Sequence, residues 1–169
     1  VGGDGENKIR EYEATIGDIT SLVWLAIGGI VLLLLLYFRR IVGLLFVVIP
    51  LGMSIAWTFA LTTWTIGTLN VITGFLFAVL FGLGIDFGLQ LYGRYREDRA
   101  AGKSPARAAD GMVLQTGAAT LTSAVTSAAA LLTLLITDFK GFSEFGFIAG
   151  VGILLAFVSF ILVLPAMIA

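Results

Sequence analysis

The chain has 169 residues, of which 59% are hydrophobic and only 12% are charged, with a formal net charge of -1. A soluble domain is about 45–50% apolar and about 25% charged, and one this small has too little interior to bury so much apolar surface. The absence of cysteine and histidine also excludes a disulfide framework, a thiolate metal site and the commonest general base. The composition therefore predicts an integral membrane protein.

The chain opens with a polar segment, residues 1–19. Within it, Ile9, Tyr12 and Ile16 recur at helical spacing, which predicts a short surface helix. The sequence does not begin with Met, shows no signal peptide and ends inside an apolar run, so we expect a fragment of a longer membrane protein.

Five apolar runs follow, and each is long enough to cross a bilayer core of about 30 Å, which takes roughly 20 helical residues. They cover residues 21–38, 41–64, 66–92, 113–136 and 141–169. Helices are required because lipid cannot hydrogen-bond an open backbone, and Pro50 in the second run kinks a membrane helix without forbidding it. The fold predicted is an all-α bundle of five transmembrane helices.

Lysine and arginine are distributed unevenly among the loops, which indicates the orientation. The loop after the first run and the linker 94–112 are rich in arginine, whereas the loop after the second run has no cation and the loop after the fourth has only Lys140. The linker is therefore expected in the cytoplasm, with the N-terminus outside and the C-terminus inside. Within the linker, Ser104 and Pro105 predict the N-cap and first residue of a short helix that leads into the fourth run.

Asp86 is the only ionisable residue deep within any of the five runs. An aspartate at the centre of a span costs about 2.5–3.5 kcal/mol on insertion scales, so its side chain should face protein or water, and such residues are functional candidates. The alternative is a structural hydrogen bond between helices. Gly82, Asp86 and Gln90 share one stripe of the helix, and Gly82, Gly84 and Gly88 make the helix thin enough for close packing.

The fourth run offers a surface of small residues between Gly117 and Ala130, which we expect to pack against the third run. This stretch also carries hydroxyl groups that could hydrogen-bond the carboxyl group of Asp86, with Ser123 and Thr126 favoured over Thr122 and Ser127. The alternative is that these hydroxyls bond carbonyl oxygens four residues earlier in their own helix.

The sequence gives little indication of an enzyme. No dinucleotide-binding fingerprint and no P-loop is present. The stretch Gly82–Asp86 is similar to the Gly-x-Gly-Asp motif of intramembrane aspartyl proteases, but the spacing differs by one residue and the second intramembrane aspartate of such a pair is missing. We therefore expect no enzyme, no metal and no cofactor.

A series of short motifs runs along the chain. In order, they are Thr68-Leu69-Asn70, Gly82-Leu83-Gly84-Ile85-Asp86-Phe87, Arg94-Tyr95-Arg96-Glu97-Asp98, Ser104-Pro105, the small-residue fourth run, Phe145-Gly146 and Leu164-Pro165-Ala166. In this order and spacing, the motifs resemble one membrane half of a resistance-nodulation-division (RND) superfamily transporter, in the branch of the MMPL lipid exporters and hopanoid-associated exporters.

The resemblance implies that the five runs are helices two to six of a six-helix half. Residues 1–19 would be the end of an extracytoplasmic (periplasmic) domain, and a second, similar half would follow. Asp86 corresponds to the acidic residue of the family's proton relay, and Gln90 is a candidate to support it together with the hydroxyl groups of the fourth run. Phe87 stands where many MMPL members have tyrosine, so the hydrogen bond of that tyrosine is absent.

The resemblance implies half of an exporter in the bacterial inner membrane, driven by the proton gradient and acting on hydrophobic or lipid-like substrates. Removal from water favours the neutral form of a carboxyl group, so Asp86 could bind a proton outside and release it inside. The expected partners are membrane lipid, the substrate and the second six-helix half, with a homo-oligomer left open and nucleic acid not expected. One alternative is a sterol- or lipid-sensing module without transport, and another is a structural scaffold.

Overall fold

The computed structural model describes residues 24–25, 28–29, 32, 41–65 and 71–168. The side chains of Ile41 and of residues 71–78 are outside this description, as are the predicted surface helix within residues 1–19 and most of the predicted span 21–38. The chain divides into two compact units, Val1–Arg39 and Arg40–Ala169. The second unit contains the predicted site.

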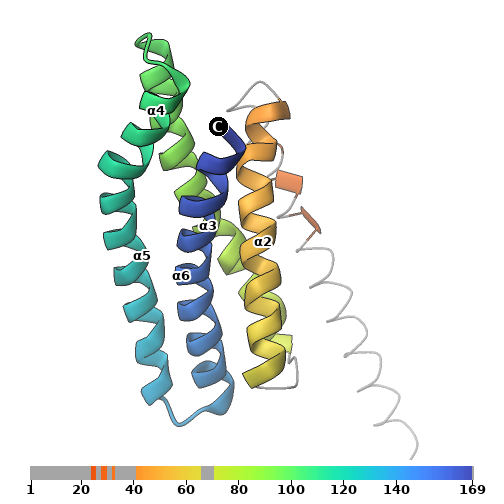
Figure 1. Cartoon of the computed structure of the whole chain (residues 1–169). Helices are drawn as coiled ribbons and strands as arrows, with labels where there is room; N and C mark the ends of the chain where they lie inside the picture. Colours follow the sequence, from red (N-terminus) through yellow and green to blue (C-terminus); the bar gives the residue numbers. More distant parts are fainter. Residues whose placement is uncertain (1–23, 26–27, 30–31, 33–40, 66–70, 169) are drawn as a thin grey trace, which may run out of the picture. The chain divides into compact units, whose positions relative to one another are not determined.

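Every element of the second unit within the described ranges is helical. In chain order they are α2 (Ile41–Thr65), α3 (Val71–Ala100), α4 (Pro105–Gly111), the π-helical turn η1 (Met112–Thr116), α5 (Gly117–Leu132), the 3-10 turn η2 (Thr133–Ile136) and α6 (Lys140–Ile168). Figure 1 shows α6 between α2 and α5, with α3 behind it. The start of α2, the end of α3, α4 and the end of α6 lie at the same end of this bundle (Figure 1).

Three of the described helices are long and apolar enough to cross a membrane: Val42–Thr65, Pro105–Ile136 and Lys140–Ile168. The prediction of an all-α membrane protein is thereby confirmed. Helix α2 passes through Pro50 without a break, as expected. Helix α3 has 30 residues and is about 45 Å long, enough for a span, but that span and the first one stay predictions.

The predicted linker 94–112 is more helical than the sequence indicated. Helix α3 continues to Ala100, and only the short turn 101–104 separates it from α4. Gly102 has a φ of +83°, a left-handed conformation that glycine adopts without a steric penalty. The predicted N-cap is confirmed, because the Ser104 side chain accepts a hydrogen bond from the backbone N–H of Arg107 and Pro105 opens the helix.

Helix α6 is the centre of the bundle and packs against α2, α3 and α5. Close approach depends on small residues: a Cβ on Gly88 of α3 would lie 2.7 Å from Phe160 and 2.8 Å from Val47, which are both fully buried. The buried Ser159 hydroxyl of α6 donates a hydrogen bond of 2.7 Å to the Pro50 carbonyl of α2. These contacts hold α2, α3 and α6 together around a single core.

The small-residue face of the fourth predicted run packs on α6 and meets α3 only over a short stretch. Its buried residues are Gly117, Thr120, Ala124 and Ala128. They lie at helical spacing on one face of α5, and Gly150 of α6 comes so close that its Cβ would lie 3.2 Å from the Ala128 carbonyl oxygen. The small residues therefore allow close packing as predicted, but the helix they approach is mainly the fifth span and not the third.

Candidate functional site

Asp86 lies on α3 about 22 Å beyond its first residue, Val71, at 1.5 Å per residue. Its side chain is exposed in this bundle, as are Gly82 and Gln90 on the same stripe. Among the described residues, none forms a hydrogen bond or an ion pair with the Asp86 carboxylate. The stripe Gly82–Asp86–Gln90 is thus a face of α3 that α2 and α6 leave uncovered.

The opposite side of α3 makes the contacts within the bundle. Gly84 and Gly88 are buried, and a Cβ on Gly84 would lie 2.5 Å from Leu51 of α2. A Cβ on Gly82, by contrast, would meet no atom of the described residues within 4 Å. Of the three glycines expected to serve helix packing, the structure therefore places two against neighbouring helices and the third beside Asp86 on the open stripe.

The structure does not bring the hydroxyl groups of α5 to Asp86. The Thr122 hydroxyl donates to the Ala118 carbonyl at 3.0 Å, and the Thr126 hydroxyl donates to the Thr122 carbonyl at 2.8 Å. Both threonines and Ser123 are exposed, and none of the three belongs to the buried face of α5. Bonding within their own helix, the alternative considered from the sequence, accounts for both threonines.

Phe87 belongs to the core of the bundle and not to the open stripe. Only 3% of its surface is exposed, and its ring packs edge-on against Phe157 of α6 with centroids 6.3 Å apart. One residue along a helix is a rotation of about 100°, which takes this ring away from Asp86. The aromatic residue therefore fixes the rotation of α3 against α6.

A second polar cluster joins the end of α3 to the helix that follows it. Asp98 is buried, with 4% of its surface exposed, and its Oδ1 atom lies 2.8 Å from Lys103 Nζ and 3.5 Å from Arg94 Nη2. The Arg94 guanidinium also donates a hydrogen bond of 2.6 Å to Gln115 Oε1 on η1. A chain of polar contacts thus crosses the 101–104 turn and joins Lys103, Asp98, Arg94 and Gln115.

This cluster has a close steric fit at Gly111, where a Cβ would collide with Asp98 Oδ2. Asp98 Oδ2 and Arg94 Nε are buried without a hydrogen-bond partner among the described residues. In the sequence, Arg94–Asp98 stands out only as a family motif, and nothing in that motif indicates a buried cluster. The i, i+4 spacing of Arg94 and Asp98 indicates that the two side chains can form an ion pair. The burial of Asp98 does not follow from this spacing, because it depends on the contact with Gly111 in the helix after the turn.

The described helices and the apolar spans define a multi-pass membrane protein. The chain belongs to the MMPL family, whose model matches residues 7–169. This confirms the resemblance to the MMPL and hopanoid-exporter branch of the RND superfamily.

Curated relatives support the same placement. The chain is 35% identical to the hopanoid transporter HpnN of Rhodopseudomonas palustris over 94% of its own length and 18% of the relative. It is 29% identical to the hopanoid transporter HpnN of Burkholderia multivorans over 96% of its length and 19% of the relative. A membrane protein of Methanocaldococcus jannaschii is 28% identical over 83% of the chain and 36% of the relative. The chain thus spans between about a fifth and about a third of these relatives.

Proposed function

We propose that the chain forms part of one membrane half of an exporter of hydrophobic or lipid-like molecules, driven by the proton gradient, with Asp86 as the proton-carrying residue. Two of the relatives are named as hopanoid transporters, which favours a lipid-like substrate. The arginine-rich end of the bundle, at the end of α3, faces the cytoplasm of a bacterial inner membrane in this proposal.

The observation that carries the proposal is the position of Asp86 on a stripe of α3 that the other described helices leave uncovered, in a mostly apolar part of the helix. A carboxylate that faces lipid is costly, so in the membrane this stripe requires protein or water against it. In a transporter with two similar halves, the second half supplies that surface. The carboxyl group then lies at an interface whose polarity depends on whether the group is charged.

Protonation removes the charge of Asp86 and with it the need for polar neighbours. The protonated form favours close apolar packing of the open stripe, whereas the charged form favours a hydrated arrangement. A proton gradient can bias such a two-state equilibrium because the two arrangements differ in their proton affinity. Gly82 and Gln90, which flank Asp86 on the stripe, would line the surface that rearranges.

The test is substrate export in inverted membrane vesicles that contain the full-length transporter, with and without an imposed pH gradient. Asp86→Asn keeps the size of the side chain and removes its titration, so gradient-driven export should fall to background. Asp138→Asn is the matched control, since Asp138 lies exposed in the turn between η2 and α6. Undiminished gradient-driven export by Asp86→Asn would contradict the proposal and favour a lipid-sensing or structural role.

A further inference from the structure

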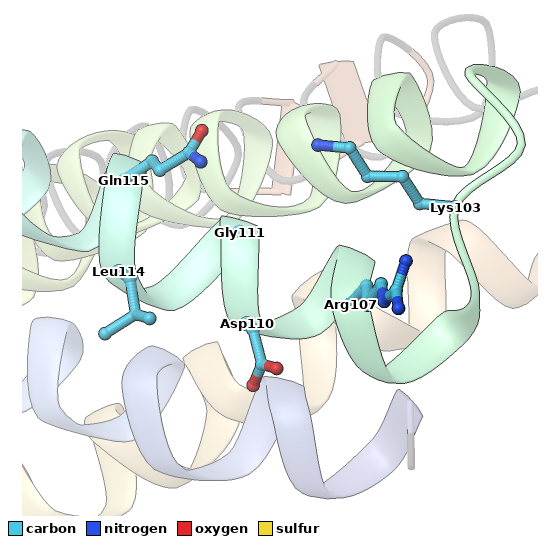
Figure 2. Close-up of a pocket in the computed structure, with 6 residues that line it drawn as sticks. All are labelled: Lys103, Arg107, Asp110, Gly111, Leu114 and Gln115. Carbon is cyan, nitrogen blue, oxygen red and sulfur yellow. The ribbon is translucent and has the colours of Figure 1, made fainter.

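A hollow of about 260 Å³ lies where α4 passes into η1, at the end of the bundle that carries the arginine-rich segment. Its lining residues are Lys103, Arg107, Asp110, Gly111, Leu114 and Gln115. Figure 2 shows Lys103 and Gln115 on one side of Gly111, and Asp110 and Leu114 on the other. The hollow is distinct from the open stripe around Asp86.

The lining combines cationic donors with one acidic and one apolar residue. Lys103 Nζ contacts Asp98 Oδ1 at 2.8 Å, which leaves donors of its ammonium group for a ligand. Arg107 is exposed, and its guanidinium forms no ion pair with any described residue. Arginine and lysine side chains form strong charge-assisted hydrogen bonds with phosphate oxygens, so a phosphate group fits this lining better than an uncharged ligand does.

The position of the hollow along the helix indicates where such a phosphate comes from. The apolar helix Pro105–Ile136 is long enough to span a membrane, and the hollow lies in its first turns. Leu114 is 76% exposed, so an apolar side chain borders the hollow on the side that continues into the span. Cations at the end of a span together with an exposed leucine match the headgroup and the upper acyl chain of a membrane lipid.

We propose that this hollow binds the phosphate of a membrane glycerophospholipid, held by Arg107 and Lys103, with the acyl chain against Leu114. Asp110 repels a second anionic group and accepts hydrogen bonds from headgroup hydroxyls. The site would attach a structural lipid where the α3–α4 turn meets the membrane. This proposal is independent of the exporter proposal, because it requires neither transport nor a proton at Asp86.

The experiment measures binding of short-chain phosphatidylglycerol to the purified full-length protein in detergent by native mass spectrometry. Arg107→Gln should weaken binding about tenfold, the expected loss for a charge-assisted hydrogen bond at a partly hydrated site. The matched control is Arg96→Gln, which removes one positive charge from the same segment but does not line the hollow. Asp110→Asn should strengthen binding of this anionic lipid, by about threefold for a screened surface charge.

Equal weakening by Arg107→Gln and Arg96→Gln would overturn the proposal, because it would show general attraction to the basic segment. Displacement of the lipid by glycerol 3-phosphate at the same concentration would also overturn it, since a soluble phosphate would then suffice. A selective loss in Arg107→Gln, with unchanged circular dichroism and no such displacement, would support the site.

Discussion

At Gly88, the packing of α3 against two neighbouring helices leaves no room for an added methyl group. Its neighbours Phe160 and Val47 are 0% exposed, and the new Cβ of Gly88→Ala would lie 2.7 and 2.8 Å from their side chains. Neither side chain can move into solvent, so the bundle must shift. Overpacking of this kind costs about 1–3 kcal/mol.

Gly82→Ala provides the matched control, because within the described part of the chain its Cβ would meet nothing within 4 Å. Both substitutions gain the same helix propensity, about 0.8–1.0 kcal/mol for alanine over glycine. The difference between the two variants therefore isolates the packing term, and Gly88→Ala should be less stable than Gly82→Ala by about 1–3 kcal/mol.

The assay is reversible unfolding of the chain in mixed detergent micelles, followed by circular dichroism as the fraction of denaturing detergent rises. Both variants and the wild type are measured under the same conditions. If Gly88→Ala proves as stable as Gly82→Ala, the contact of α3 with α2 and α6 through Gly88 is wrong.

Two further predictions concern polar contacts, and the same unfolding assay checks both. Asp98→Asn should lower the free energy of unfolding by about 1–3 kcal/mol, because the carboxylate is buried between two cations. The control is Glu97→Gln, whose side chain is 73% exposed and which should change this free energy by less than about 0.5 kcal/mol. Equal effects of the two substitutions would refute the buried cluster. Ser159→Ala should lower the free energy of unfolding by about 0.6–1.7 kcal/mol, since it removes the hydrogen bond to the Pro50 carbonyl. Thr63→Val removes an exposed hydroxyl bonded within its own helix and should lower this free energy by less. An unchanged stability of Ser159→Ala would argue against the contact with Pro50.

Much of the architecture follows from hydropathy alone. Run length and the requirement for internal backbone hydrogen bonds predict helices, and α2 and α6 end within a residue of the predicted runs 41–64 and 141–169. The linker was less predictable because hydropathy marks where a helix leaves the membrane and not where it ends. Helix α3 continues past the apolar run to Ala100, with charged side chains that water and ion pairs accommodate.

Which helix packs on which was harder to predict from the sequence. Small residues indicate that a helix face can approach a neighbour closely, but they do not specify the neighbour. The face of α5 meets α6 because α6 also carries small residues, Gly146 and Gly150, at the facing positions. The candidate hydroxyls of α5 consequently lie away from Asp86 within this bundle, and their role as relay partners stays a prediction.

The buried position of Asp98 could not be predicted from the α3 sequence. In a helix rich in charged residues at its end, each carboxylate would be expected in water. Asp98 is covered because the chain reverses at Gly102 and because Gly111 has no side chain in the way. Gly111 lies too far beyond Asp98 in the sequence for a local pattern to indicate this contact.

In the proposed mechanism, Asp86 binds and releases a proton within the membrane. The most direct test is infrared spectroscopy of the membrane-embedded full-length protein over a range of pH, comparing wild type with Asp86→Asn. We predict a protonated-carboxyl band in the wild type that changes with pH and is absent from the variant. An identical carboxyl spectrum in both proteins at every pH would contradict the claim.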